Sequence, residues 1–118
     1  MTLRLRREKP AIIGRWNILE MSAWDERFIH LAGQAFIEFR DRNRGQFGFG
    51  AVSGDLDYRL GERDGLPLVE WCWLGFDEGD PTCGRGWAVL RPEGNLEGEI
   101  FFHEGDESRF SARRTRRR

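Results

Sequence analysis

Apolar and polar residues alternate with a period of two over most of this chain. Between residues 55 and 60, Leu56, Tyr58 and Leu60 are separated by single charged residues. This period is typical of a strand with one face turned toward a core. Eight runs of this kind are predicted to be strands, at residues 11–22, 34–40, 47–51, 55–60, 66–74, 87–91, 96–103 and 108–112.

The links between these runs are short and rich in glycine, aspartate and asparagine, as tight turns are. Asp64-Gly65 is a strong hairpin signal. Strands joined by tight turns are antiparallel, and closing such a meander removes its two exposed edges. The predicted fold class is therefore all-β, an eight-stranded antiparallel up-and-down barrel. An open two-layer sandwich of the same strands is the alternative.

One short helix is predicted after the first strand, within residues 25–31. Trp24, Phe28 and Leu31 are spaced as on one face of a helix. Asp25 is placed as an N-cap, and Gly33 as a stop. We expect this helix to cover one end of the barrel.

Gly14-Arg15-Trp16 opens the first strand, and together with the helix and the eight-strand meander it resembles the calycin superfamily of lipocalins, fatty-acid-binding proteins and avidins. The resemblance implies a barrel in which Trp16 packs across one end. The stretch Asp80-Pro81-Thr82-Cys83-Gly84-Arg85-Gly86-Trp87 is similar to one shared by a set of small uncharacterised bacterial proteins. That second resemblance implies no activity.

The chain has 118 residues, enough for one domain with one modest core. We expect a polar arm at 1–10, a single barrel domain at 11–112 and an arginine-rich tail at 113–118. The net charge is +3 over residues 1–10, −9 over 11–110 and +5 over 111–118. Because an acidic body repels nucleic acid and anionic membranes, we expect neither as a partner, except for nucleic acid through the tail.

The first ten residues are too charged for a signal peptide, and the chain carries only Cys72 and Cys83 as cysteines. These features predict a cytoplasmic protein with reduced thiols. His30 and His103 are the only histidines and lie far apart in the sequence. We therefore predict no metal site and no cofactor, with His103 pointing away from the barrel interior.

The longest irregular stretch is expected at residues 76–85, which carry Asp80, Cys83 and Arg85. Loops on rigid scaffolds often carry function. Arg85 is suited to a ligand carboxylate or phosphate, and Cys83 beside it is a candidate nucleophile. The alternative is a solvated acidic turn without a ligand.

The second candidate region is the barrel interior, toward which seven aromatic residues are predicted to point. They either line a pocket for a flat apolar ligand or fill the barrel. By parity Glu70 shares a face with Leu68 and Cys72, and Trp71 and Trp73 lie on the other face. If the Glu70 face is inward, Glu70 is a buried acid that needs a partner, and the outward tryptophans form a homodimer surface. The seven residues are Trp16, Phe39, Phe49, Tyr58, Trp87, Phe102 and Phe110.

These observations favour a non-enzymatic small-molecule-binding or accessory protein with a lipocalin-like barrel. Its site is expected at the barrel mouth, lined by Trp16, Glu70, Trp87 and the 76–85 stretch, for a small apolar or aromatic ligand. One alternative is an enzyme that uses Cys83, Asp80 and Arg85. Another is a nucleic-acid or protein adaptor that acts through the arginine-rich tail.

Overall fold

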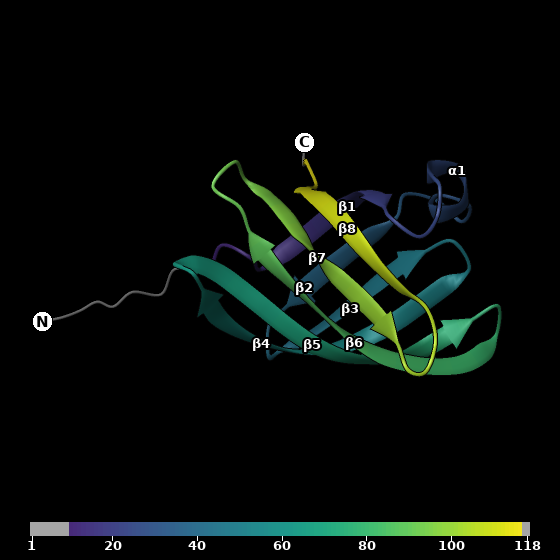
Figure 1. Ribbon diagram of the computed structural model, residues 1–118. Coiled ribbons are helices and arrows are strands. Elements are labelled where there is room, and N and C mark those ends of the chain that lie inside the picture. The colour runs from purple at the N-terminus through teal and green to yellow at the C-terminus, as the bar shows by residue number, and fades with distance from the viewer. Residues whose placement is uncertain (1–9, 117–118) are drawn as a thin grey trace, which may run out of the picture.

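The computed structural model describes residues 10–116 and shows a closed, eight-stranded antiparallel barrel with one short helix (Figure 1). The predicted fold class is therefore confirmed. Residues 1–9 and 117–118 lie outside the described residues, and with them most of the predicted arm and the end of the tail. The elements are β1 (Gly14–Met21), α1 (Glu26–Ile29), β2 (Phe36–Arg40), β3 (Arg44–Phe49), β4 (Val52–Arg63), β5 (Leu66–Asp77), β6 (Asp80–Leu90), β7 (Asn95–Phe102) and β8 (Glu107–Arg114).

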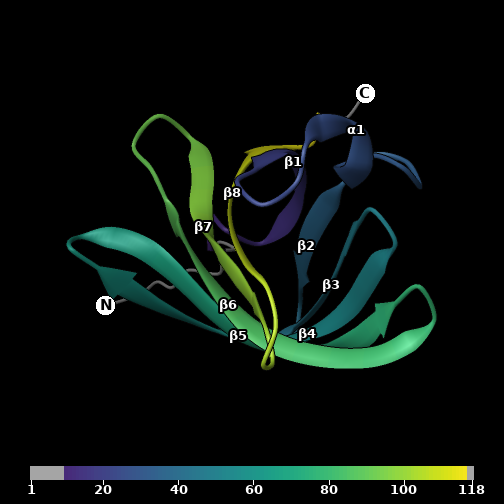
Figure 2. The same ribbon diagram turned by 45° about the vertical axis from the view of Figure 1, so that its right-hand side comes forward.

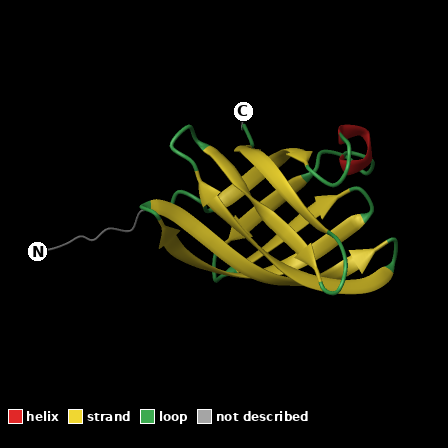
Figure 3. Ribbon diagram, viewed as in Figure 1, coloured by secondary structure: helices red, strands yellow, loops and turns green. Residues whose placement is uncertain are grey.

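Neighbouring strands pair in chain order, and β1 also pairs with β8, which closes the barrel (Figure 3). Trp16 lies opposite Arg114 in this closing pair, and the register shifts by a bulge between Ile18 and Glu20. The closing pair excludes the open sandwich. Because β8 runs to Arg114, the tail predicted to begin at residue 113 begins two residues later, and Arg113 and Arg114 belong to the barrel wall.

Because the strands are antiparallel, successive connections lie alternately at one end of the barrel and at the other (Figure 2). The start of β1 and the end of β8 lie at one end, which we call the Trp16 end. The turns at 41–43, 64–65 and 91–94 lie there too. The other end, which we call the α1 end, carries α1 and the turns at 50–51, 78–79 and 103–106.

The helix α1 is one turn long and shorter than the predicted 25–31. Asp25 is its N-cap, as predicted, and its carboxylate accepts a hydrogen bond of 2.9 Å from the backbone N–H of Phe28. The ring of Trp24 lies 5.3 Å from that of Phe49 and 6.1 Å from that of Phe102. These aromatic contacts cover the α1 end of the barrel.

The prediction that residues 76–85 form an irregular stretch is wrong. β5 and β6 continue toward each other until Asp77 pairs with Asp80, and only Glu78 and Gly79 form the turn. Both turn residues have positive φ, 53° and 86°, as a tight hairpin requires. The alternation of apolar and polar residues does not reveal the first half of β6, because glycines, Gly84 and Gly86, occupy two of its inward positions in place of apolar side chains.

These glycines make room for tryptophans on the neighbouring strand. A Cβ atom at Gly86 would lie 2.4 Å from the indole of Trp71, and one at Gly84 would lie 2.8 Å from the indole nitrogen of Trp73. Trp71 and Trp73 are 4% and 2% exposed and point into the barrel. The predicted outward Trp71/Trp73 dimer face is therefore wrong, because the larger apolar surface of β5 is the one that is buried.

Six of the seven aromatic residues predicted to face inward do so, and they pack edge to face across the interior. Phe49, for example, lies 6.4 Å from Phe102, and Phe39 lies 5.3 Å from Tyr58, centroid to centroid. Trp87 is the exception: it lies between buried Gly86 and Ala88 and faces outward. Aromatic side chains thus occupy the core of the barrel.

Candidate functional site

The predicted site residues do not form a barrel mouth. Trp16 lies at the Trp16 end, whereas Asp80 and Cys83 lie on β6 near the α1 end. Glu70 and Trp87 lie directly opposite each other on β5 and β6, on the outer wall of the barrel. Glu70 is exposed, so the prediction of a buried acid is wrong.

Trp16 seals its end of the barrel. It is 1% exposed, and its indole N–H donates a hydrogen bond of 2.9 Å to the carbonyl of Ile12. The guanidinium of Arg114 lies 4.3 Å from the indole ring and donates to the carbonyls of Ile13 and Ala11. Trp16 therefore has the position that the calycin resemblance implies, with no open face for a ligand.

Three of the predicted site residues meet in a hollow of about 460 Å³ on the outer wall of β4–β7. Glu70 lies opposite both Arg59 and Trp87, and Cys72 lies opposite Arg85. The outward side chains that line the hollow are those of Asp57, Arg59, Glu70, Cys72, Arg85, Trp87 and Phe101. We call this the β4–β7 hollow.

The β4–β7 hollow combines aromatic surface with an uncompensated arginine. The guanidinium of Arg85 lies 5.3 Å from the ring of Phe101, and no carboxylate among residues 10–116 lies within ion-pair distance of it. Arg59, by contrast, is paired with Asp57 at 2.6 Å. The exposed Arg85 is therefore the group in the hollow that is available to an anion.

Trp87 forms the other side of the hollow. Its indole N–H donates a hydrogen bond of 3.2 Å to the carboxylate of Glu99, and the guanidinium of Arg63 lies 4.5 Å from its ring. These two contacts hold the indole against the wall. A second hollow of about 410 Å³ borders Trp87 on the side of β7, β8 and β1, where Arg91 faces Glu97 at 3.9 Å and Arg109 and Glu20 also line the wall. Only the β4–β7 hollow of these two combines Trp87 with a second outward aromatic ring, that of Phe101.

The structure brings His103 beside Cys83, which the sequence alone did not indicate. The backbone N–H of His103 donates a hydrogen bond of 2.8 Å to the carbonyl of Cys83. The imidazole is largely exposed, as predicted, and lies 3.9 Å from Glu104. No hydrogen bond joins the thiol to the imidazole in the described part of the chain.

Among the buried side-chain nitrogen and oxygen atoms of residues 10–116, one has no hydrogen-bond partner. The indole N–H of Trp71 is buried without a hydrogen-bond acceptor, whereas that of Trp73 donates to the carbonyl of Phe101 at 3.3 Å. Between residues 10 and 116, no three His, Cys, Asp or Glu side chains come close enough to hold a metal ion. No helix in that same range is long and apolar enough to cross a membrane.

Comparison with known proteins found no match to a family model, to a curated protein or to a solved structure. The likeness to lipocalins therefore rests on the barrel and on the position of Trp16.

Proposed function

We propose that this chain is a non-enzymatic small-molecule-binding or accessory protein with a lipocalin-like barrel, and that its ligand binds on the outer wall. The observation that carries the proposal is the β4–β7 hollow, where unpaired Arg85 lies beside the half-buried ring of Trp87. The barrel interior is a less favourable ligand site, because aromatic side chains pack across it and both ends are covered.

The hollow favours a ligand with a flat apolar body and one anionic group. Trp87 and Phe101 supply apolar surface, and Arg85 supplies a planar, charged donor that pairs well with a carboxylate, sulfonate or phosphate. Glu70 at the same edge disfavours a dianion, since its carboxylate repels a second negative charge. A bacterial, cytoplasmic setting is part of this proposal.

The test is a titration with anilinonaphthalene sulfonate, a flat apolar probe with one anionic group. We expect saturable binding that Arg85→Ala weakens by roughly tenfold to a hundredfold, the value of a charge-assisted hydrogen bond. Arg27→Ala on α1 is the matched control, because it removes an arginine of the α1 end and is expected to leave binding unchanged.

The five tryptophan indole N–H signals in a nitrogen–proton correlation spectrum locate the bound probe. We expect the signal of Trp87 to move while those of buried Trp71 and Trp73 stay in place. Movement of the Trp71 or Trp73 signal would place the ligand inside the barrel and overturn the outer-wall site. Equal binding by wild type and Arg85→Ala would also overturn it.

A further inference from the structure

Charge is divided between the two ends of the barrel. The connections of the α1 end and the strand residues directly next to them carry eight carboxylates and a single arginine, Arg27. At the opposite end the turns carry Asp41, Asp64 and Glu93 as well as Arg42 and Arg91, but arginines cluster on the strand ends. Antiparallel pairing brings the start of β1 beside the ends of β2 and β8, and the end of β2 beside the start of β3. The acidic residues are Asp25, Glu26, Asp77, Glu78, Asp80, Glu104, Asp106 and Glu107.

Four of the arginines form a continuous outward surface on β8, β1, β2 and β3, which we call the arginine face. The members are Arg113, Arg15, Arg40 and Arg44, in strand order. Arg113 lies opposite Asn17, two residues from Arg15 on the same face of β1, and Arg40 lies opposite Arg44.

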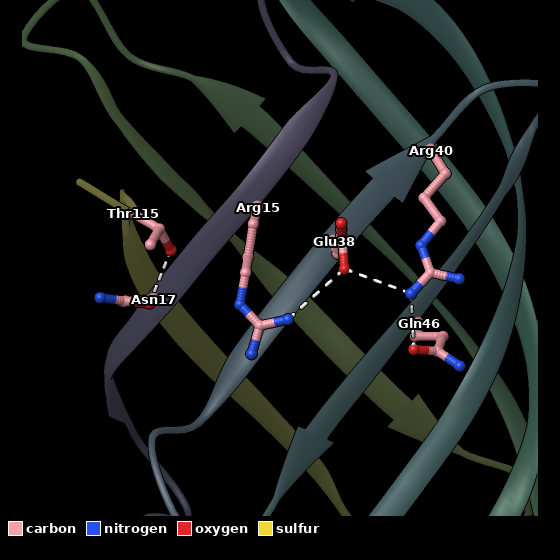
Figure 4. A network of polar contacts seen from close by, with 6 residues as sticks. All are labelled: Arg15, Asn17, Glu38, Arg40, Gln46 and Thr115. Carbon is pink, nitrogen blue, oxygen red and sulfur yellow. Dashed lines mark hydrogen bonds and ion pairs between the residues drawn. The ribbon is translucent and has the colours of Figure 1, made fainter. Parts of the chain in front are cut away.

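Glu38 is the carboxylate that the arginine face holds at its centre (Figure 4). It accepts from both Arg15 and Arg40 at 3.4 Å, and those two side chains are still 43% and 51% exposed. Arg44 and Arg113 have no ion pair among residues 10–116. The face therefore carries three positive charges in excess.

An aromatic groove adjoins the arginine face. The guanidinium of Arg15 lies 3.8 Å from the ring of Phe36, and Phe36 lines a groove of about 530 Å³ that runs across β3 and β4 to Phe76. The Phe76 side chain is 53% exposed, and Leu74 beside it is 72% exposed. Asp55 is the carboxylate in the groove.

We propose that this surface binds single-stranded nucleic acid, with phosphates on the arginine face and bases in the aromatic groove. Guanidinium groups pair with phosphates, and exposed aromatic rings stack on bases that are free of a duplex. A duplex keeps its bases stacked and would leave the exposed ring of Phe76 unused. The groove shares the strands β4, β5 and β6 with the β4–β7 hollow but none of its lining residues, so either proposal can fail without the other.

The aromatic groove reaches the acidic α1 end at Phe76, which precedes Asp77, so it takes the uncharged bases, whereas the arginine face that takes the phosphates lies toward the other end. β1 has seven residue steps of about 3.3 Å, so the two ends lie about 23 Å apart along it. Electrostatic repulsion is screened over about 8–10 Å at physiological ionic strength. The separation of charge by the barrel thus permits an anion at the Trp16 end of a chain whose described residues are acidic overall.

The experiment measures fluorescence anisotropy of a labelled oligothymidylate of about 15 nucleotides, at salt concentrations between about 50 and 200 mM. With four phosphates contacted, we expect a slope of log affinity against log salt of about −3. Arg15→Ala and Arg113→Ala should each reduce the magnitude of this slope by about 0.7. Phe76→Ser should weaken binding on the order of tenfold without changing the slope.

Two matched variants sharpen the test. Glu38→Gln removes the carboxylate that Arg15 and Arg40 share, and it should tighten binding. Arg27→Ala, at the α1 end, should leave both affinity and slope unchanged.

The proposal is overturned if the oligonucleotide does not bind, or if the arginine variants bind it with the wild-type slope. It is also overturned if a duplex of equal charge binds as tightly, or if polyglutamate competes equally well. The last result would identify the arginine face as a surface for an acidic protein.

Discussion

Tyr58 joins the core of the barrel to the turn between β2 and β3. Its ring lies edge-on to Phe39 at 5.3 Å, and its hydroxyl donates a hydrogen bond to the carbonyl of Arg40. Burial, and then the carboxylate of Asp41, raise the pKa of Tyr58 above its ordinary value of 10.0. The neutral phenol is therefore the form that the folded protein favours.

Tyr58 is the only tyrosine of the chain, so its titration can be read directly from phenolate absorbance. We expect a midpoint above that of free tyrosine. Because the folded state keeps a proton that the unfolded state loses, the free energy of unfolding should fall as pH rises above about 10. Chemical unfolding at about pH 9 and about pH 11 should show this fall in wild type but not in Tyr58→Phe. A midpoint at the free-tyrosine value would contradict the burial of the phenol.

At the scale of elements, the closing pair of β1 and β8 depends on side chains as well as on backbone hydrogen bonds. Arg114 reaches from β8 across the ring of Trp16 to two carbonyls that precede β1. Thr115 extends the same pairing, since its hydroxyl donates to the side-chain oxygen of Asn17 at 2.7 Å (Figure 4). The two chain ends are thus fastened to each other where the barrel closes.

Arg114→Ala should lower the free energy of unfolding by about 2–3 kcal/mol, because it removes the cation–π contact and leaves two carbonyls without this donor. Arg113→Ala is the control, since its exposed side chain has no ion pair among the described residues, and it should change stability by less than about 0.5 kcal/mol. Urea unfolding of both variants measures the difference. Equal effects would show that Arg114 does not fasten the barrel.

At the scale of the whole molecule, closure and a shared aromatic core make every strand depend on two neighbours. No strand among the described residues is an edge that could separate alone. Charge is distributed unevenly over the same frame: the α1 end is mainly acidic, whereas the Trp16 end carries a cluster of arginines together with Asp41, Asp64 and Glu93.

We therefore expect one cooperative unfolding transition. Tryptophan fluorescence reports the core and far-ultraviolet circular dichroism reports the strands, and the two curves should coincide. Separate transitions would show that part of the barrel unfolds independently and would contradict a single core.

Most of the fold could be predicted from the sequence, because tight turns and the two-residue period are local features. Asp64-Gly65 and the N-cap Asp25 form as their residue types predict. The hairpin at Glu78 and Gly79 could not be predicted, because Gly84 and Gly86 interrupt the apolar alternation. Only the packing of Trp71 and Trp73 from the neighbouring strand explains why glycine occupies these two positions.

The candidate sites depend still more on tertiary structure. β5 is apolar on both faces, so parity alone could not say whether Glu70 or Trp71 points inward. The sequence by itself determined an eight-stranded meander, one capped helix and an aromatic core, since each follows from neighbours in the chain. Only the tertiary structure decided which face is buried and which charges gather at one end. Those outcomes depend on residues that are far apart in sequence and meet only when the barrel closes.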